Sequence, residues 1–365
     1  MDPKSISVLG AALIGALACA PAATRAAEPG SGADQAAAEP LRAAQPARLA
    51  ARGLLIAIAP AGGRLVAVGD RGIIVLSDDH GASWQQAKYV PTQALLTGVC
   101  FLDAQRGVAV GHDQVILTSG DAGHTWKRTH YAPQAQGPLL DVWCGAGGEV
   151  IAVGAYSAYL RSTDGGASWR EVTFVPLPAT AGGGGHSPAA ADSSAADAGA
   201  GGGYHLNRIV GAGNGRLYIA GEAGHLYRSD DGGASWRTLP SPYEGSFFGV
   251  LPLTAESLLA FGLRGHLYRS ADEGRSWQAI DTGTVAMLTG ATRLDGGAVA
   301  IVGLSGVVLL SRDGGHSFTL WQQTDRTGLS ATVVAGDGRL AVAGEDGAKV
   351  IAPPPSTAPA PVAAP

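Results

Sequence analysis

The stretch STDGGASW, residues 162–169, contains the pattern that decides the fold of this 365-residue chain. The pattern is Ser-x-Asp-x-Gly-x-Ser/Thr followed by an aromatic residue, and each copy is called a box below. Successive boxes start 42, 43, 67, 41 and 41 residues apart. A near-constant period of about 40 residues indicates a β-propeller, in which each repeat is one blade. The boxes start at Ser77, Ser119, Ser162, Ser229, Ser270 and Ser311, and the last ends in Phe318 in place of Trp.

Each repeat has the same order of apolar runs ahead of its box. In the first repeat these runs are 54–60, 64–70 and 72–77, and a fourth begins at the box Trp. Short aliphatic runs bounded by Gly and Asp are typical of strands, and four strands make one propeller blade. Complete units begin near Leu54, Leu95, Leu139, His205, Ser246 and Val285.

A seventh unit covers residues 329–353, with three apolar runs but neither a box nor a fourth strand. The sequence therefore predicts an all-β, seven-bladed propeller. We expect residues 41–50 to supply the missing strand, because an N-terminal strand would close the ring and cover two exposed edges.

The box residues predict a tight turn between the third and fourth strands. Asp and Ser side chains hydrogen-bond to the backbone of such turns, and Gly adopts backbone angles that other residues avoid. We therefore interpret the box aspartates as structural, and we expect the box Trp side chains to be buried in equivalent positions. The aspartates are Asp79, Asp121, Asp164, Asp231, Asp272 and Asp313.

Composition argues against several function classes. The formal charge of −5 does not fit a nucleic-acid-binding protein, which needs a basic surface. No His or Cys has the spacing of a zinc site, and the sequence contains no phosphate loop or nucleophile elbow. We expect no metal, no cofactor and no catalytic residue.

The N-terminal residues 1–27 predict a signal peptide. They combine Lys4 with an apolar run and a series of small residues, which is the order of a secretory signal. A lipoprotein signal at Cys19 is the less favoured alternative, because Ala16 stands where such signals prefer Leu. We expect export, to the periplasm or to a thylakoid lumen, without a transmembrane span in the mature chain.

Three further segments differ from the repeats. Residues 28–40 and 353–365 are rich in Ala and Pro and predict flexible tails on either side of a propeller at 41–352. Residues 179–203 are rich in Gly and Ala and have no apolar periodicity, which predicts a disordered insert.

Two cysteines, Cys100 and Cys144, remain beyond the signal peptide. They fall at matching places in the innermost strands of neighbouring blades, where equivalent positions are usually too far apart for a disulfide. We expect two buried free thiols, with a disulfide as the alternative in an oxidising compartment.

The turns between second and third strands lie on the face opposite to the boxes. Loops on a rigid scaffold are a common location for binding residues, so we expect this face, called the turn face below, to bind a partner. Its candidate residues are Arg71, Asp113, Tyr156, Glu222, Arg264 and Asp346, and Ser305 is the corresponding residue of the sixth repeat.

Arginines recur immediately before the box Ser of three consecutive repeats, as Arg161, Arg228 and Arg269. They could form a basic crescent near the boxes, but we favour solvated ends of strands. His225 and His266 recur at one strand-start position of adjacent repeats. A residue that recurs in register is more often set by the repeat than by catalysis.

The turn AVG-x-x-G precedes the third strand, as AVGDRG at 67–72. With the boxes, the period and the predicted signal peptide, it makes the chain resemble the photosystem II stability/assembly factor family. The resemblance covers about residues 48–352 and implies an exported, non-enzymatic, seven-bladed propeller that binds membrane-protein assembly intermediates. We expect a monomer whose partner is a membrane-protein complex.

A carbohydrate-binding or sialidase-like glycosidase propeller is the alternative function, because Asp boxes also occur in sialidases. Those enzymes need an arginine cluster, a Tyr nucleophile with a Glu partner and an acidic acid/base. Their Arg-Ile-Pro element ahead of the first box has no match in RGLLIAIAP, residues 52–60.

Overall fold

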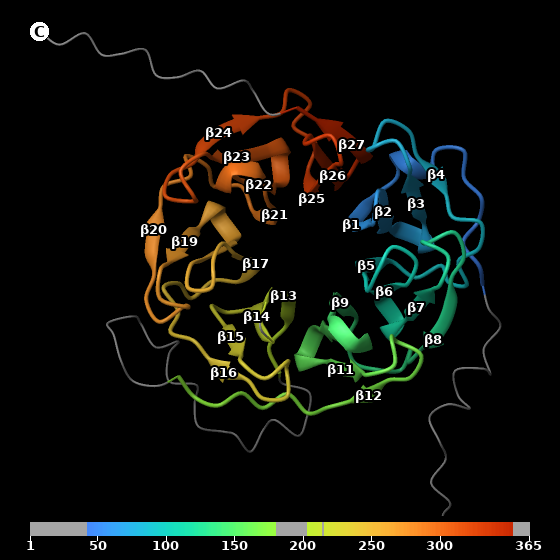
Figure 1. The fold of residues 1–365 in the computed structure, drawn as a ribbon, viewed down its shortest axis with the longest axis horizontal. Helices are drawn as coiled ribbons and strands as arrows, with labels where there is room; N and C mark the ends of the chain where they lie inside the picture. Colours follow the sequence, from blue (N-terminus) through green and yellow to red (C-terminus); the bar gives the residue numbers. More distant parts are fainter. Residues whose placement is uncertain (1–41, 180–202, 214, 353–365) are drawn as a thin grey trace, which may run out of the picture.

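The computed structural model describes residues 42–179, 203–213 and 215–352, which form seven antiparallel sheets around a central axis (Figure 1). The predicted seven-bladed all-β propeller is confirmed. Each sheet is one blade, and the blades are numbered 1 to 7 in chain order. The first 41 residues, residues 180–202, residue 214 and residues 353–365 lie outside the described part. The predicted signal peptide and tails fall there, as does most of the predicted insert.

Within a blade, the strands run from the axis outward in chain order. The innermost strands are β1 (Leu55–Ala61), β5 (Leu96–Phe101), β9 (Leu139–Cys144), β13 (Leu206–Gly213), β17 (Phe247–Pro252), β21 (Leu288–Arg293) and β25 (Leu329–Val334). The second strands are β2 (Arg64–Gly69), β6 (Gly107–Gly111), β10 (Val150–Gly154), β14 (Arg216–Gly221), β18 (Leu258–Gly262), β22 (Val299–Gly303) and β26 (Leu340–Gly344).

The third strands are β3 (Ile74–Ser77), β7 (Ile116–Ser119), β11 (Tyr159–Ser162), β15 (Leu226–Ser229), β19 (Leu267–Ser270), β23 (Val307–Ser311) and β27 (Gly347–Ile351). The outer strands are β4 (Gln85–Gln86), β8 (Lys127–His130), β12 (Arg170–Glu171), β16 (Arg237–Thr238), β20 (Gln278–Ile280) and β24 (Thr319–Gln322). Short 3₁₀ turns are η2 (Ala50–Arg52), η3 (Asp70–Gly72), η4 (His112–Gln114), η5 (Ala146–Gly148), η6 (Ala155–Ser157), η7 (Leu263–Gly265), η8 (Asp295–Gly297) and η9 (Leu304–Gly306).

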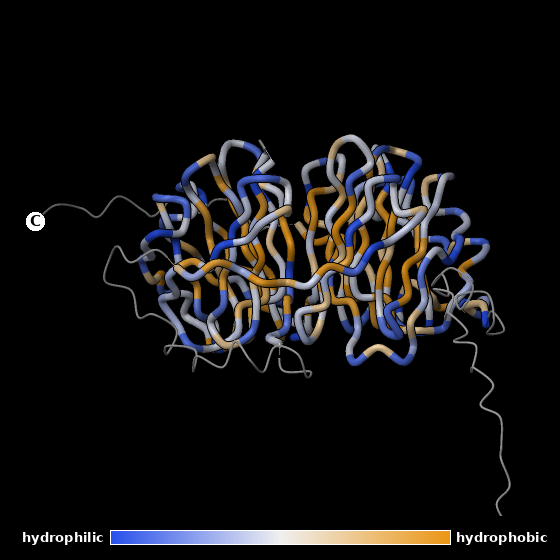
Figure 2. The backbone as a smooth tube through the Cα atoms, turned by 90° about the horizontal axis from the view of Figure 1, so that it is seen from below, coloured by the Kyte–Doolittle hydropathy of each residue, from blue (hydrophilic) through white to orange (hydrophobic). Residues whose placement is uncertain are grey.

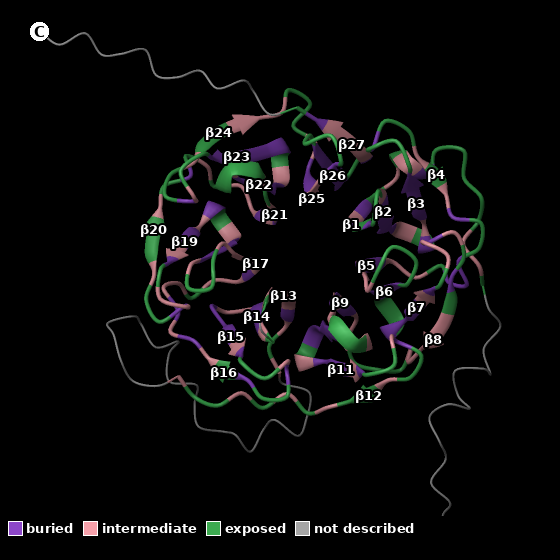
Figure 3. Ribbon diagram, viewed as in Figure 1, coloured by how far each residue is buried: buried purple, intermediate pink, exposed green. Residues whose placement is uncertain are grey.

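The hydrophobic core lies between neighbouring blades (Figure 3). In β2, Val66 packs toward blade 2, whereas Leu65 and Ala67 pack toward blade 7. Successive side chains of a strand point to opposite faces, so a strand covered on both faces must be apolar throughout. This explains the unbroken apolar runs of the second strands.

The Gly that ends each second strand is required by a close approach. A Cβ on Gly69 would lie 2.1 Å from the carbonyl oxygen of Leu54, and one on Gly111 would lie 2.1 Å from that of Leu95. The innermost strand is irregular at this level, as between Leu55 and Ala57 in blade 1. Only Gly leaves room for that backbone, which accounts for the AVG-x-x-G pattern.

The two ends of each third strand lie on opposite faces of the disc, which Figure 2 shows from the side. The turn between the second and third strands lies on one face, and the box turn between the third and fourth strands lies on the other. Polar residues concentrate in the loops of both faces, while apolar segments run between them (Figure 2). Both kinds of turn are therefore available to solvent.

The predicted N-terminal closing strand is wrong. Blade 7 has three strands, and residues 42–49 run beside blade 1 and lead into η2. The backbone N–H of Ala44 donates to the carbonyl oxygen of Val90 at 2.9 Å, and that of Ala47 donates to Oε1 of Gln86 at 2.8 Å. These bonds hold the segment on blade 1, so the ring closes by packing of β1 against β25 instead.

The expectation of free thiols is also wrong, because Cys100 and Cys144 form a disulfide with a Cα–Cα distance of 5.7 Å. Their positions do not match. Cys100 is opposite Val108 and Cys144 is opposite Val150, which is one residue further along its strand. A shift of one residue turns a side chain to the other face of a strand. Cys100 therefore faces blade 3 while Cys144 faces blade 2, and the two sulfurs meet between the blades.

Candidate functional site

Each box is a turn whose polar groups bond to one another. In blade 3, the Ser162 hydroxyl donates to Oδ1 of Asp164 at 2.7 Å, and the backbone N–H of Gly166 donates to Ser162 Oγ at 2.9 Å. Both the N–H and the hydroxyl of Ser168 donate to the Asp164 carboxylate. The same set of bonds recurs in the other five boxes.

These bonds set the acidity of the box aspartates. The hydroxyl of Ser168, followed by its backbone N–H, lowers the pKa of Asp164 to about 2. The pKa of Asp79 is lowered to about 2 by the equivalent groups of Ser83. Carboxylates that accept several bonds within their own turn stay ionised and have few lone pairs left for a substrate. This geometry supports the interpretation of the box aspartates as structural.

On the opposite face, the first six blades present one residue each from a left-handed turn position. Arg71, Asp113, Tyr156, Ala223, Arg264 and Ser305 have φ angles of 51°, 58°, 53°, 50°, 55° and 57°. The residue that follows each of them has a positive φ as well, and two such central residues make a turn that matches the twist of a β-hairpin. Glu222 lies one residue before this position, and Asp346 lies in the shorter hairpin of blade 7.

The structure brings together only two of the candidates on this face. Tyr156 meets the ring of His205 edge-on with centroids 5.0 Å apart, and Oε2 of Glu222 lies 3.8 Å from Nδ1 of the same His205. Arg71 pairs with its neighbour Asp70 at 3.0 Å. Within the described ranges, no hydrogen bond, ion pair or ring contact joins Asp113, Arg264 or Asp346 to another candidate. These side chains stand apart on their own blades.

The sequence reasoning missed an aromatic cluster on the turn face of blades 3 and 4. Tyr204 stacks on His225 with centroids 3.9 Å apart and lies close to Tyr156, since its carbonyl oxygen accepts from the N–H of Ser157 at 3.0 Å. Tyr156 and Tyr204 remain 47% and 40% exposed. Burial lowers the pKa of His225, so this ring stays neutral and packs as an aromatic platform. The signal available in the sequence was the grouping of Tyr204 and His205 directly before a strand.

A buried carboxylate was missed as well. Asp141 on β9 is 6% exposed, accepts from the backbone N–H of Ile209 at 2.9 Å and lies 3.5 Å from Nε of Arg208. Burial raises the pKa of Asp141, against the lowering effect of Arg208. The bond to Ile209 ties the innermost strands of blades 3 and 4 together, which is a structural use of the only acid in that strand.

The favoured interpretation of the three recurring arginines as solvated strand ends is wrong for two of them. The side chains of Arg161 and Arg228 are only 17% and 13% exposed, because each extends under the box of the next blade. Arg161 donates to the carbonyl oxygen of Gly232 at 3.2 Å, and Arg228 donates to Glu273 at 2.7 Å. Nε of Arg269 is buried without a hydrogen-bond partner.

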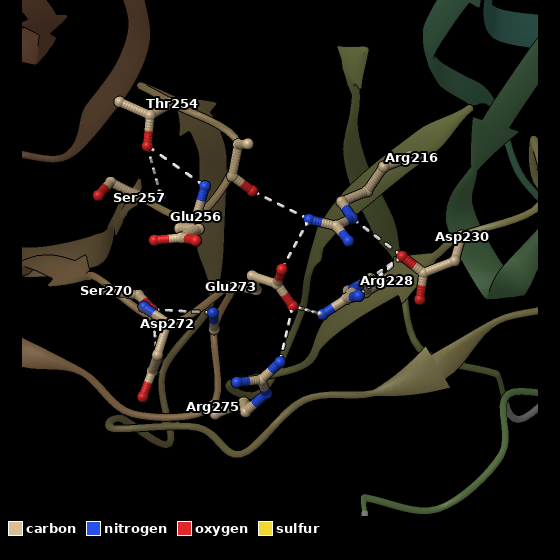
Figure 4. A network of polar contacts seen from close by, with 12 residues as sticks. Arg216, Arg228, Asp230, Thr254, Glu256, Ser257, Ser270, Asp272, Glu273 and Arg275 are labelled. Carbon is tan, nitrogen blue, oxygen red and sulfur yellow. Dashed lines mark hydrogen bonds and ion pairs between the residues drawn. The ribbon is translucent and has the colours of Figure 1, made fainter. Parts of the chain in front are cut away.

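Three arginines converge on Glu273 at the joint between blades 4 and 5 (Figure 4). Arg216, Arg228 and Arg275 lie 3.1, 2.7 and 2.9 Å from its carboxylate oxygens. Burial alone would raise the pKa of Glu273, but the bonds and charges of Arg228 and Arg216 outweigh it and lower the pKa. Asp230 also pairs with Arg216 and Arg228, so the cluster sets three arginines against two carboxylates at the box side of the ring.

Two hollows open beside these arginines. One of 330 Å³ is lined by Arg161, Trp169 and Arg170 of blade 3 among others, and one of 270 Å³ is lined by Arg228, Arg237 and Arg275 among others. They occupy corresponding places on neighbouring blades, because Arg170 and Arg237 each pair with the strand arginine of their own blade. Both are shallow and shaped by the repeat.

Seven sheets, six box turns and two distinct faces define a seven-bladed Asp-box β-propeller. The polar side chains of its box turns hydrogen-bond within their own turns, and its turn face carries exposed side chains. A sequence model of the family described as "Photosynthesis system II assembly factor YCF48" matches residues 76–197, which begin in the third strand of blade 1. The predicted resemblance to the photosystem II assembly-factor family is thereby confirmed.

Solved structures agree on the fold. "YCF48 bound to D1 peptide" is 15% identical with a TM-score of 0.62, covering 84% of this chain and 94% of that one. "YCF48 from Cyanidioschyzon merolae" is 18% identical with a TM-score of 0.61, covering 84% of this chain and 96% of that one. A GH74 xyloglucanase from Xanthomonas campestris is 17% identical with a TM-score of 0.60, covering 82% of this chain and 52% of that one. No curated protein sequence matches the chain.

No helix in the described part of the chain has the length and apolar character needed to cross a membrane.

Proposed function

We propose that this chain is an exported, non-enzymatic binding protein that holds a segment of a membrane or exported protein complex during assembly. The observation that carries the proposal is the match of residues 76–197 to the YCF48 assembly-factor model. A second support is that a propeller with the same fold has been solved with a bound D1 peptide. The apolar N-terminal segment supports export, because its order of charge, apolar run and small residues is that of a secretory signal.

The aromatic cluster of blades 3 and 4 is the part of the turn face that we propose to contact the partner first. Tyr156 and Tyr204 expose large rings that are already held in place, by a hairpin turn and by stacking on His225. Rings held in this way lose little side-chain entropy on binding and are frequent among the residues that dominate interfaces. Arg71, Asp113, Glu222, Arg264 and Asp346 would then form a polar rim of mixed charge around the ring.

The test is capture of partner from detergent-solubilised membranes of the source organism, with the mature protein as bait and quantitative mass spectrometry as the readout. We expect Tyr156→Ala combined with Tyr204→Ala to lower capture of the main partner by at least about tenfold, equivalent to the loss of about 1.4 kcal/mol of binding free energy. Tyr89→Ala is the matched control, since Tyr89 is 46% exposed on the outer side of blade 1.

Equal capture by the two variants would exclude the aromatic cluster as the contact. If no protein is enriched by the wild type over the bait-free resin, the assembly-factor proposal itself is overturned.

Carbohydrate binding is the second candidate function, because exposed Tyr rings such as Tyr156 and Tyr204 also suit stacking on sugars. The two candidates separate in a glycan array and in hydrolysis assays on sialosides and β-glucans. The assembly-factor proposal predicts neither retention nor turnover in these assays. Glycan retention that is lost in the Tyr156→Ala and Tyr204→Ala variant would favour the second candidate.

A further inference from the structure

The outer edge of blade 7 differs from every other blade edge. Six blades end in a fourth strand, whereas β27 is the last strand of a three-stranded sheet. Alternate residues of a strand direct their N–H and C=O groups to opposite sides, so part of β27 has hydrogen-bonding groups that β26 does not use. No described residue pairs with that side, and Ala348, Lys349 and Val350 are half-buried.

The missing box has a local cause. Leu340 is opposite Ile351 in blade 7, as Val299 is opposite Ser311 in blade 6, so Ile351 stands where the box Ser belongs. Ile351 is 7% exposed and packs into the core between blades 6 and 7. Without the Ser hydroxyl there is no anchor for a box turn, and the chain continues into Pro353, Pro354 and Pro355.

Blade 7 nevertheless has a complete core. At each of the other six interfaces, the box aromatic of the later blade packs against the earlier blade, as Trp126 does between blades 1 and 2. Between blades 6 and 7, Trp321 of β24 supplies the aromatic ring from the earlier blade. The core between blades 6 and 7 therefore contains its aromatic ring without a fourth strand, and an added strand would contribute main-chain bonds to the edge of β27.

The chain's own ends are poor occupants of this edge. Residues 44–47 are bonded to blade 1. The residues after Ile351 include six prolines in the last 13 positions, and proline cannot donate to a strand ladder.

A second copy is also disfavoured. Antiparallel pairing of two β27 edges about their middle would place Lys349 opposite Lys349, and like charges directly opposite are destabilising. A segment of a different polypeptide therefore remains as the occupant that fits the edge of β27.

We propose that the outer edge of β27 is a docking site for an extended, proline-poor segment of another polypeptide, which adds as the fourth strand of blade 7. Main-chain bonds to an exposed edge give affinity in this mode of recognition, and alternate side chains give specificity. Lys349 lies on the side facing blade 6, where it pairs with Asp325 at 2.5 Å. This site is separate from the turn face and does not depend on the proposed function.

The probe is a phage-displayed library of random linear peptides, selected on the full chain. We expect enriched peptides to be proline-poor. A graft variant, in which 351–365 are replaced by a copy of 311–322, supplies its own box and fourth strand. We expect it to bind the enriched peptides at least about tenfold more weakly than the wild type, measured as Kd by fluorescence polarisation.

The matched control is the same graft with the copies of Thr319 and Trp321 changed to Pro, which cannot pair with the edge and should bind like the wild type. A measurement on the unaltered chain guards against a graft that fails to fold: saturating peptide should slow amide hydrogen exchange of Ala348 to Val350.

The other outcomes each overturn the proposal. No enriched peptide, equal binding to both grafts, or unchanged exchange at β27 would show that the edge does not accept a strand. Binding that appears only after deletion of 353–365 would show that the tail is the occupant. A concentration-dependent dimer in analytical ultracentrifugation that the pairing graft abolishes would identify a second copy.

Discussion

The two ends of each third strand are built from the same kinds of residue but use them differently. At the box end of β11, the side chains of Ser162, Asp164 and Ser168 bond to one another and to the turn backbone. At the other end, Tyr156 sits in a left-handed turn position and is 47% exposed. The first turn uses its polar groups internally, and the second leaves a large part of a side chain exposed. Under the proposed function, stability and binding would be separated onto opposite faces.

The largest test of this separation removes a box aromatic. Trp126 is 3% exposed and packs between blades 1 and 2, so Trp126→Ala should lower the free energy of unfolding by about 3–5 kcal/mol. Tyr156→Ala, the turn-face counterpart, should change it by less than about 0.5 kcal/mol. Urea unfolding followed by Trp fluorescence and circular dichroism measures both. Similar losses of unfolding free energy in the two variants would contradict the distinction between the stabilising box turns and the turn face.

The disulfide lies toward the box end of the innermost strands, so it should belong to the stabilising side. It closes a loop with a sequence separation of 44, for which the loss of unfolded-state entropy predicts a contribution of about 2–4 kcal/mol. Cys100→Ala combined with Cys144→Ala should lower the urea midpoint accordingly and leave partner capture unchanged at a temperature where the ring is folded. Wild-type protein under reducing conditions is the control and should behave like the double variant.

A box aspartate should have a smaller effect. Asp164→Ala leaves the hydroxyls and N–H groups of its turn without their acceptor, which should cost about 1–3 kcal/mol at neutral pH. Asp164→Asn, which keeps the size but not the charge, should fall between the two proteins. Thermal unfolding gives the comparison, and hydrolysis of glycosides by the wild type that Asp164→Ala abolishes without loss of stability would contradict a structural role.

The same residue predicts a pH dependence. The pKa of Asp164 is about 2 in the folded chain against an ordinary value of 3.8. A depressed folded pKa contributes stability that is present above the unfolded value and lost as the pH falls through the folded one. The difference in unfolding free energy between wild type and Asp164→Ala should therefore shrink between about pH 4 and pH 2. A difference that grows over this range would show that the sign is wrong.

The smallest effect on stability is expected at the charged turn-face positions. Arg71 has a side chain that is 81% exposed, so Arg71→Glu combined with Arg264→Glu should change the unfolding free energy by less than about 0.5 kcal/mol. The same double variant should weaken capture of an acidic partner, since it reverses two charges on that face. Loss of stability without loss of capture would reverse the assignment of the two faces.

Repetition explains how much of the fold was predictable. Each box predicts one hairpin between a third and a fourth strand. Counting the boxes and the apolar runs therefore predicted seven blades and the two kinds of turn. The predicted burial of the box Trp side chains was only partly right. Trp126 and Trp236 are buried, whereas Trp84, Trp169 and Trp277 are half-buried. Burial depends on what the neighbouring blade places over the ring, and this varies between repeats.

The errors arose where one blade meets another. The disulfide depends on a shift of one residue between β5 and β9, which the expectation of matching positions overlooked, although Cys100 stands 19 residues before Ser119 and Cys144 stands 18 residues before Ser162. Arg161 and Arg228 look like exposed strand ends within their own repeats, yet the next box covers them. The candidate site was predictable to the level of a face, because turn positions follow from the repeat. The pairing of Tyr204 with His225 was not, since it joins a residue just ahead of the innermost strand of blade 4 to the residue that precedes its third strand, and the apolar pattern does not specify such a contact.

The joint between blades 7 and 1 gives the ring a defined place to open. No strand crosses it, and β1 meets β25 only through apolar side chains such as those of Leu55 and Ala331. The Cys100–Cys144 disulfide, by contrast, is a covalent cross-link between blades 2 and 3. The described chain begins beside blade 1, to which Ala44 and Ala47 are bonded, and ends on blade 7, so a pulling force applied to its two ends acts on the two blades of this joint. Stretching a single molecule should separate blade 7 from blade 1 first and then unfold the blades one after another. The disulfide should keep the residues between Cys100 and Cys144 from extending, so the final contour length should be shorter by that loop.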